Sequence, residues 1–262
     1  MPLAPLPSHT RLATVDAAPD PIMLWPSHME AGEQGRWHAH MKGQLIYPQK
    51  GRYRIYTHHQ MWAGSPRRAC WIPAGVEHTV WALDALDIHN VYVSEQLPVQ
   101  LPTHCQLLPV MPLLEMLLAF GSQLAPHDPS SSQLYAHTLA LIADIMGIAN
   151  REALSPLPMS SDRRIRPIMN ALLQDPADQR GLADWALATF TTARTLARCF
   201  RSEVGMSFSQ WRQQLRATEA ITRIENGHSV QHIAYDMGYS SQSAFTAMFR
   251  RVTGYCPSHF KP

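Results

Sequence analysis

One sequence pattern occurs twice in the last hundred residues of this 262-residue chain, and it constrains the architecture most. The copies span residues 192–205 and 241–254, and they match at a hydroxyl residue, a large apolar residue, a Phe, an Arg and a Gly. Upstream, Ala186 aligns with Ala234 if the turn of the second copy holds one extra residue. Because an internal repeat reflects a repeated structural unit, we expect two small helical units, each a helix pair joined by a tight turn.

The sequence around this repeat predicts an all-α region over residues 162–262. Apolar residues recur there at spacings of three and four, which is typical of helices with one buried face. Hydroxyl residues precede the apolar runs and Gly follows them, as expected at helix starts and ends. The predicted helices are 163–173, 182–188, 193–203 after a Thr191 or Thr192 cap, a long connector between Ser207 and Gly227, one after Ser229, 242–252, and a short one from Pro257.

The N-terminal part has a different pattern, which predicts β-structure. Short aromatic and β-branched runs lie between Gly and Pro turns over residues 23–94, which favours a small β-barrel or jelly roll. The predicted strands are 44–47, 53–57, 69–72, 78–81 and 88–93, with Tyr47, Trp62, Trp71, Trp81 and Tyr92 mostly in the core. Residues 1–20 are rich in Pro and Ala, and we expect a loose arm there.

Two apolar helix-forming stretches lie between these parts. Residues 112–120 begin with a proline suited to a first helical turn, and residues 134–148 follow a Ser131 or Ser132 cap, so together they predict a helical hairpin. The hairpin either packs only on the barrel or also pairs with a second subunit in a two-fold homodimer, and the sequence does not separate these alternatives. Residues 151–161, with two prolines and three serines, are the predicted linker.

A histidine pattern lies within the β-region. Gly32, five residues, His38, Ala39, His40, three residues, Gln44, six residues and Gly51 are followed later by Pro73, Gly75 and His78. This arrangement resembles the cupin family, which holds a divalent metal with such histidines and a Glu where Gln44 stands. On a strand, His38 and His40 would face the same side, and His78 would join them from a neighbouring strand.

The cupin resemblance is incomplete, so two interpretations of the histidines stay open. Gln44 is a neutral and weaker ligand than Glu, and Ala82 stands where the motif ends in Asn. Either His38, His40, Gln44 and His78 bind a divalent metal, or the histidines line a polar pocket for a small effector.

Charge and cysteine content narrow the class of protein. Residues 162–262 hold 13 Arg and Lys against 8 Asp and Glu, a net charge of +5, whereas residues 1–161 hold 9 against 12, a net charge of −3. The basic part is rich in arginine, which suits contacts to phosphate and guanine. The four cysteines are scattered without a CxxC motif, and neither a signal peptide nor a membrane span is evident, so we expect a cytoplasmic protein with reduced thiols.

The C-terminal region resembles the AraC/XylS family of transcription regulators. The resemblance covers about a hundred residues and rests on Trp211, Arg216, Ala220, residues 233–245, residues 249–254 and Pro257. It implies an α+β multidomain protein with an N-terminal cupin-like β-barrel, a helical hairpin and an all-α domain with two helix-turn-helix units. The implied domains are the arm 1–20, barrel 21–105, hairpin 106–150, linker 151–161 and DNA-binding domain 162–262.

The resemblance also implies a set of DNA-contacting residues. These are Thr192, Arg194, Ala197, Arg198 and Arg201 in the first unit, and Ser241, Gln242, Ser243, Ala247, Arg250 and Arg251 in the second. Of these, the candidates for phosphate contact are Thr192, Arg201, Ser241, Arg250 and Arg251. Arginine can bind guanine bidentately, so we expect base reading to depend mainly on Arg194 and Arg198, unless these contact only phosphates. Phe190 stands where the first turn usually has Gly, and Ala247 stands where the second helix often has Arg.

The leading functional hypothesis is therefore a transcriptional regulator that is not an enzyme. Its partners would be double-stranded promoter DNA, a small effector bound in the barrel, and RNA polymerase if it is an activator. One alternative is a metal-responsive regulator in which the cupin histidines hold the effector. A cupin metalloenzyme is the less favoured alternative, because the carboxylate ligand is missing and a DNA-binding domain is attached.

Overall fold

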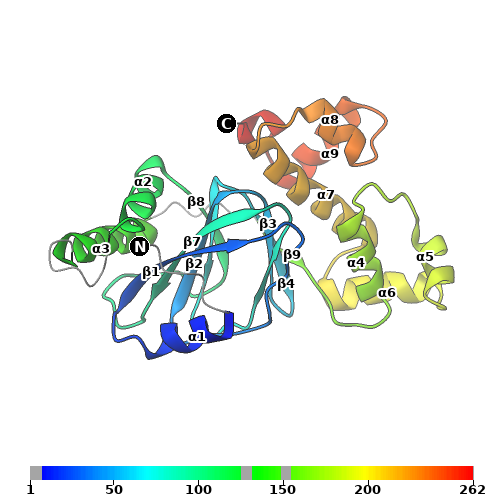
Figure 1. Cartoon of the computed structure of the whole chain (residues 1–262). Helices are drawn as coiled ribbons and strands as arrows, with labels where there is room; N and C mark the ends of the chain where they lie inside the picture. Colours follow the sequence, from blue (N-terminus) through cyan, green and yellow to red (C-terminus); the bar gives the residue numbers. More distant parts are fainter. Residues whose placement is uncertain (1–7, 125–131, 149–154, 262) are drawn as a thin grey trace. The chain divides into compact units, whose positions relative to one another are not determined.

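The computed structural model describes residues 8–124, 132–148 and 155–261 (Figure 1). The chain divides into two units. The first comprises residues 1–57 and 64–154, and the second comprises residues 58–63 and 155–262. The first unit is dominated by antiparallel strands and the second by helices, so the predicted α+β fold class is confirmed.

An antiparallel sheet of five strands forms the framework of the first unit. Its order is β1-β7-β2-β5-β8, with β1 Ile22–Met29, β7 Leu86–Val93, β2 Gly43–Lys50, β5 Arg68–Ile72 and β8 Gln106–Pro109. Strands β3 (Tyr53–Tyr56) and β6 (Thr79–Ala82) form a further antiparallel pair. The five predicted strands correspond to β2, β3, β5, β6 and β7, whereas the sequence pattern missed β1, β8 and β4 (Gln60–Gly64).

The register of the sheet separates its two faces. Gln44 is opposite Ile72 and Tyr92, and the next residue, Leu45, is opposite Trp71 and Val91. Because side chains alternate along a strand, Gln44 and Leu45 lie on opposite faces. The Leu45 face forms a hydrophobic core with helices α2 (Pro112–Gly121) and α3 (Ser132–Ile148), which are the two helices of the predicted hairpin. The alternative Ser131 cap lies outside the described residues.

The hairpin also has an apolar face that no described residue covers. Leu113, Met116 and Phe120 on α2 are exposed, as are Leu134 and Leu141 on α3. The hairpin thus packs on the sheet through only part of its apolar surface. Pairing of the remaining face with a second subunit stays a prediction.

The N-terminal segment is not a loose arm over the residues that the structure describes. Residues Ser8–Ala17 form helix α1, and Val15 on this helix is buried. The ammonium group of the buried Lys42 donates to the carbonyl oxygens of Val15 (3.1 Å) and Ala18 (2.8 Å), and the amide of Met41 donates to Asp16 Oδ1. The expectation of a loose arm was therefore wrong for this helix, since Lys42 satisfies carbonyls at its end.

The second unit contains six α-helices in its described part and one short 3-10 helix. They are α4 (Arg166–Gln174), α5 (Leu182–Ala188), α6 (Ala193–Val204), α7 (Phe208–Glu225), α8 (Val230–Asp236), α9 (Gln242–Thr253) and η1 (Pro257–Phe260). Each corresponds to a predicted helix, although α4 begins at Arg166 rather than at residue 163. Among the described helices of the whole chain, none combines the length and hydropathy needed to cross a membrane.

Part of the predicted linker is ordered within the second unit. Leu157–Pro158 form strand β9, which pairs antiparallel with β4 (Gln60–Gly64). Leu157 and Met159 are buried, and the indole of Trp211 on α7 donates to the carbonyl oxygen of Pro158 at 2.7 Å. Sequence periodicity could not reveal this pairing, because its partners lie about a hundred residues apart.

Candidate nucleic-acid interface and histidine cluster

The two repeats fold into equivalent turns. After α5, the amide of Thr191 donates to the carbonyl oxygen of Ala186 at 3.0 Å, and after α8 the amide of Tyr239 donates to that of Ala234 at 2.9 Å. In both turns the preceding residue has a positive φ, 51° at Phe190 and 75° at Gly238. The turns therefore share one backbone form, and the second holds one more residue before its next helix, as the alignment predicted.

The hydroxyl and glycine residues of the repeat mark the ends of its second helices. Thr192 Oγ1 accepts from the amide of Thr195 at 3.1 Å, and Ser241 Oγ accepts from the amide of Ala244 at 3.2 Å. The same helices end at Gly205 and Gly254, which both have left-handed backbone conformations. Both predicted phosphate-contact hydroxyls are thus N-caps, and helix N-termini of this kind favour phosphate.

Helix α6, the second helix of the first repeat and here called the first reading helix, presents its predicted DNA-contacting residues along one side. Arg194, Ala197, Arg198 and Arg201 follow a spacing of three and four on α6, so they form one stripe. The arginines of this stripe are exposed, whereas the opposite face of α6 carries the buried Leu196, Cys199 and Phe200. The geometry leaves three guanidinium groups available to a ligand on this side of the unit.

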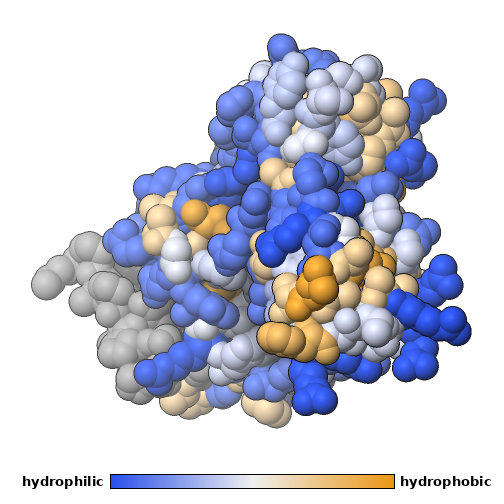
Figure 2. All heavy atoms as spheres, turned by 90° about the vertical axis from the view of Figure 1, so that its right-hand side faces the viewer, coloured by the Kyte–Doolittle hydropathy of each residue, from blue (hydrophilic) through white to orange (hydrophobic). Residues whose placement is uncertain are grey.

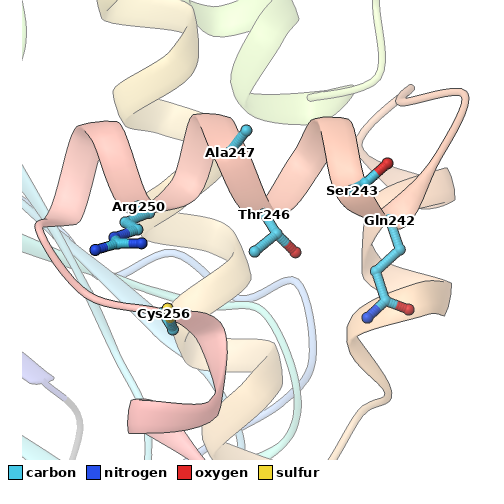
Figure 3. A pocket seen from close by; sticks show the side chains of 6 residues that line it. All are labelled: Gln242, Ser243, Thr246, Ala247, Arg250 and Cys256. Atoms are coloured by element: carbon cyan, nitrogen blue, oxygen red, sulfur yellow. The ribbon is translucent and has the colours of Figure 1, made fainter.

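Helix α9, the second helix of the second repeat and here called the second reading helix, borders a shallow hollow of about 570 Å³. The hollow is lined by Gln242, Ser243, Thr246, Ala247, Arg250 and Cys256. Figure 3 shows Gln242, Thr246 and Arg250 spaced along one side of α9, with Cys256 below the helix on the chain that follows it. The structure therefore brings together four predicted residues and adds two that were missed. The spacing of four after Gln242 could have indicated Thr246, whereas Cys256 joins only through the fold.

The two adjacent arginines near the end of α9 differ in their surroundings. Arg250 lines the hollow. Arg251 instead donates from Nη2 to Gln213 Oε1 on α7 at 3.3 Å. Of the two predicted phosphate contacts, Arg250 therefore belongs to the same surface as Gln242, and Arg251 must leave Gln213 or share its donors to bind a phosphate.

Helix α7 connects the two repeats. It contains 18 residues, so it extends over about 27 Å at 1.5 Å per residue. Near its start, the Phe208 ring lies 5.3 Å from that of Phe200 on α6. Further along, the Arg216 guanidinium lies 5.3 Å from the Tyr239 ring, and its Nε donates to the carbonyl oxygen of Pro176 at 2.7 Å. These contacts fix both repeats on one rigid helix.

The first turn carries an unusual exposed residue. Phe190, where the glycine was expected, adopts a left-handed backbone conformation and is 98% exposed. Leu187 on α5 is also 81% exposed. Figure 2, viewed from the side where α5 lies in Figure 1, shows a compact apolar area within a mostly hydrophilic surface. The absence of glycine has therefore not changed the turn, and it places a strained aromatic residue in solvent.

The three predicted histidines of the first unit lie together. His38 and His78 form an isolated antiparallel bridge, with amide-to-carbonyl distances of 3.0 and 2.9 Å, and their rings are 4.4 Å apart. The His40 ring is 5.2 Å from that of His78. His38 and His40 lie on an irregular extended segment and not on the expected strand. The side-chain nitrogens of the three residues lie within 4.8 Å of one another.

Hydrogen bonds fix the tautomer of each ring. His38 Nδ1 and His78 Nδ1 each lie 2.8 Å from a backbone carbonyl oxygen, those of Arg36 and Val76, and His40 Nδ1 contacts the carbonyl oxygen of Lys42. A carbonyl oxygen only accepts, so the three Nδ1 atoms carry the protons and donate. The Nε2 atoms are left with free lone pairs, which is the form of histidine that binds metals.

Hydrogen bonds also fix the orientation of the Gln44 side-chain amide. Asn90 donates from Nδ2 to the carbonyl oxygen of Trp25, so its Oδ1 must accept, and Gln44 Nε2 donates to it at 2.9 Å. Gln44 Oε1 then faces His40 Nε2 at 2.9 Å and His78 Nε2 at 3.1 Å. The lone pairs of Gln44 Oε1, His40 Nε2 and His78 Nε2 therefore converge, and no proton lies between them when the rings are neutral. The sequence pattern missed Asn90, although a polar residue in an apolar strand was a usable signal.

Burial disfavours protonation of His78 and His38. It lowers the pKa of His78 to about 3, with further lowering by the adjacent His38 and His40. Burial also lowers the pKa of His38. Protonation of His78 at neutral pH therefore does not relieve its contact with Gln44 Oε1, whereas a cation at this point would. The residues present fit a divalent metal, which would be held by His38, His40, His78 and the amide oxygen of Gln44.

Two capped helix-turn-helix units on one rigid helix, with exposed arginines along a reading helix, define a DNA-binding protein. A helix-turn-helix domain family matches residues 185–262. The transcriptional regulator NimR of Escherichia coli K12 is 31% identical over 226 residues, covering 85% of this chain and 81% of NimR. An AraC-like transcription regulator of Streptomyces lividans is 28% identical over 145 residues, covering 52% of this chain and 47% of the relative.

The chain belongs to the AraC-type family of helix-turn-helix transcriptional regulators, as the sequence resemblance predicted. A solved structure of ToxT from Vibrio cholerae matches over 92% of this chain and 98% of ToxT, with 11% sequence identity and a TM-score of 0.37.

Proposed function

We propose that this regulator binds promoter DNA through both repeats at once and that a small effector in the N-terminal unit controls the binding. The observation that carries the first part is the pair of equivalent helix-turn-helix units held by α7. Such a connector allows each reading helix to enter a major groove on one face of the duplex, about 34 Å apart. The net charge of +5 over residues 162–262 supports contact with the phosphate backbone.

The proposed roles within the interface are unequal. Arg194 and Arg198 are exposed on the first reading helix and have the donor geometry for guanine. On the second helix, Gln242 can pair with adenine, while Ser243 and Ala247 offer little direct discrimination between bases. We therefore assign most base reading to the first repeat, and mainly a positioning role to the second, with Arg250 at phosphate.

Site selection from random duplex DNA by the full-length protein tests this function. We expect enriched sequences with two elements separated by about one helical turn, 10–11 base pairs, and with the more constrained element containing guanine. Truncation of either element should weaken binding. Enrichment of one isolated element, or of none, would contradict simultaneous binding by both repeats.

We place the effector-binding site on the face of the main sheet opposite the hairpin. That face carries Gln44, Asn90 and Tyr92 beside apolar residues such as Ile72, the mixture that small-molecule sites use. An effector there would change DNA affinity by as much as its own affinity differs between the two states of the protein.

The converging lone pairs favour a second candidate, a metal-responsive regulator. In this case a divalent metal bound by His38, His40, His78 and Gln44 would form part of the signal. We expect the DNA affinity of the full-length protein to change on addition of a divalent metal and His38→Ala to abolish the change. The unaltered protein treated with a chelator is the control, and an affinity that ignores metal would exclude this candidate.

A further inference from the structure

The donor groups of the histidine cluster carry no negative charge. Each of the three rings donates from Nδ1 to a backbone carbonyl oxygen, and Gln44 is an amide, so none of these groups is an anion. Among the described His, Cys, Asp and Glu side chains, only His38, His40 and His78 form this group. A divalent cation held here would keep its full double charge, which would then dominate the local electrostatics.

No Asp or Glu of the described residues contributes an oxygen atom to this group. An uncompensated double charge in a partly buried site attracts an anion, since Coulomb energies grow as the effective dielectric constant falls.

One side of the cluster is accessible to solvent. His40 and His78 are 3% and 0% exposed, whereas His38 is only half-buried. Trp37, next to His38 in sequence, and Met41, next to His40, are both exposed. A cation held by three imidazoles and one amide could therefore accept a further ligand from the His38 side, as open metal sites do.

We propose that this site, once it holds a divalent cation, takes a small carboxylate as its effector. The carboxylate would complete the coordination sphere and offset the charge that the neutral side chains leave. This inference rests on the metal-responsive candidate and specifies its signal as a metal and an anion together. Gln44 decides the preference, because a glutamate in its place would itself neutralise part of the charge.

Cobalt spectroscopy tests the proposal, since the visible absorption of Co²⁺ changes with its ligands. Full-length protein loaded with Co²⁺ is titrated with sodium propionate and, separately, with propionamide, the neutral analogue of similar shape. We expect propionate to change the spectrum with saturation and propionamide to leave it unaltered. A cobalt spectrum that propionate does not change would overturn the carboxylate inference and leave metal binding intact, whereas failure to bind Co²⁺ would overturn both.

The matched variant is Gln44→Glu, which keeps the side-chain shape and adds a charge. This variant should bind Co²⁺ more tightly. It should also need at least about tenfold more propionate for half-saturation, because the anion meets a less positive site. Equal propionate affinity in both proteins would contradict the charge argument. The new carboxylate faces Asn90 Oδ1 and can impair folding, so the comparison of propionate with propionamide in the unaltered protein decides independently.

Discussion

Gly238→Ala is expected to destabilise the second unit by about 2–4 kcal/mol, because it combines left-handed backbone strain with overpacking. Gly238 has φ of 75°, and a Cβ there would lie 2.8 Å from the carbonyl oxygen of Ala177 and 2.1 Å from Gln179 Nε2. The Gln179 side chain can move, although it would lose its 2.9 Å bond to the Gly238 carbonyl, but the Ala177 backbone cannot move freely. Urea unfolding of the full-length protein, followed by helical circular dichroism, measures the change.

The equivalent position in the first repeat gives a matched control with the opposite sign. Phe190→Gly should stabilise the same unit by about 0.5–1 kcal/mol, since glycine adopts positive φ without the strain of a side chain. The phenyl ring is 98% exposed, so its removal costs little packing. If both substitutions destabilise the protein, Phe190 makes a contribution that its backbone and exposure do not explain.

Arg194→Ala and Arg198→Ala are each expected to weaken binding to the selected DNA site by about 1–3 kcal/mol, roughly 5- to 150-fold in affinity. Both guanidinium groups are exposed on the stripe that α6 presents, and neither substitution removes a buried contact. On a scrambled duplex the loss should be much smaller, because only the charge term remains. Equilibrium binding to both duplexes at one salt concentration distinguishes the two terms.

Arg201→Ala provides the control within the same helix. Arg201 lies in the last turn of α6, away from the N-terminal turns that enter the groove, and should act through phosphate. Its substitution is expected to weaken selected and scrambled DNA equally. Equal losses for Arg194→Ala or Arg198→Ala would assign that arginine to phosphate contact and shift base reading to the second repeat.

The helical part of the fold was largely predictable, because its signals are local. Hydroxyl residues such as Thr192 and Ser241 cap the next helix within three residues, and Gly205 and Gly254 end these helices through their own backbone conformation. Spacing along α6 and α9 also predicted which of their side chains face away from the hydrophobic core. Cys256 was missed because it reaches the hollow from outside the helix.

The β-structure and the N-terminal helix were less predictable, because their stability depends on distant partners. Strand β9 has only two residues and exists through pairing with β4. Helix α1 has a weak apolar pattern, and its end is satisfied by Lys42, 24 to 27 residues away. Neither partner can be inferred from propensity, which considers only neighbouring residues.

The sequence by itself determined that two equivalent helical units exist and which of their side chains face outward, since both properties follow from the internal repeat, helical periodicity and capping. It also identified His38, His40, Gln44 and His78 as a group. Only the tertiary structure decided how these four side chains are oriented and which of their atoms face one another. The tertiary structure places Asn90 against Gln44, backbone carbonyls accept from Nδ1 of each histidine, and burial lowers the pKa of His78. These orientations depend on contacts between strands, which no local pattern encodes.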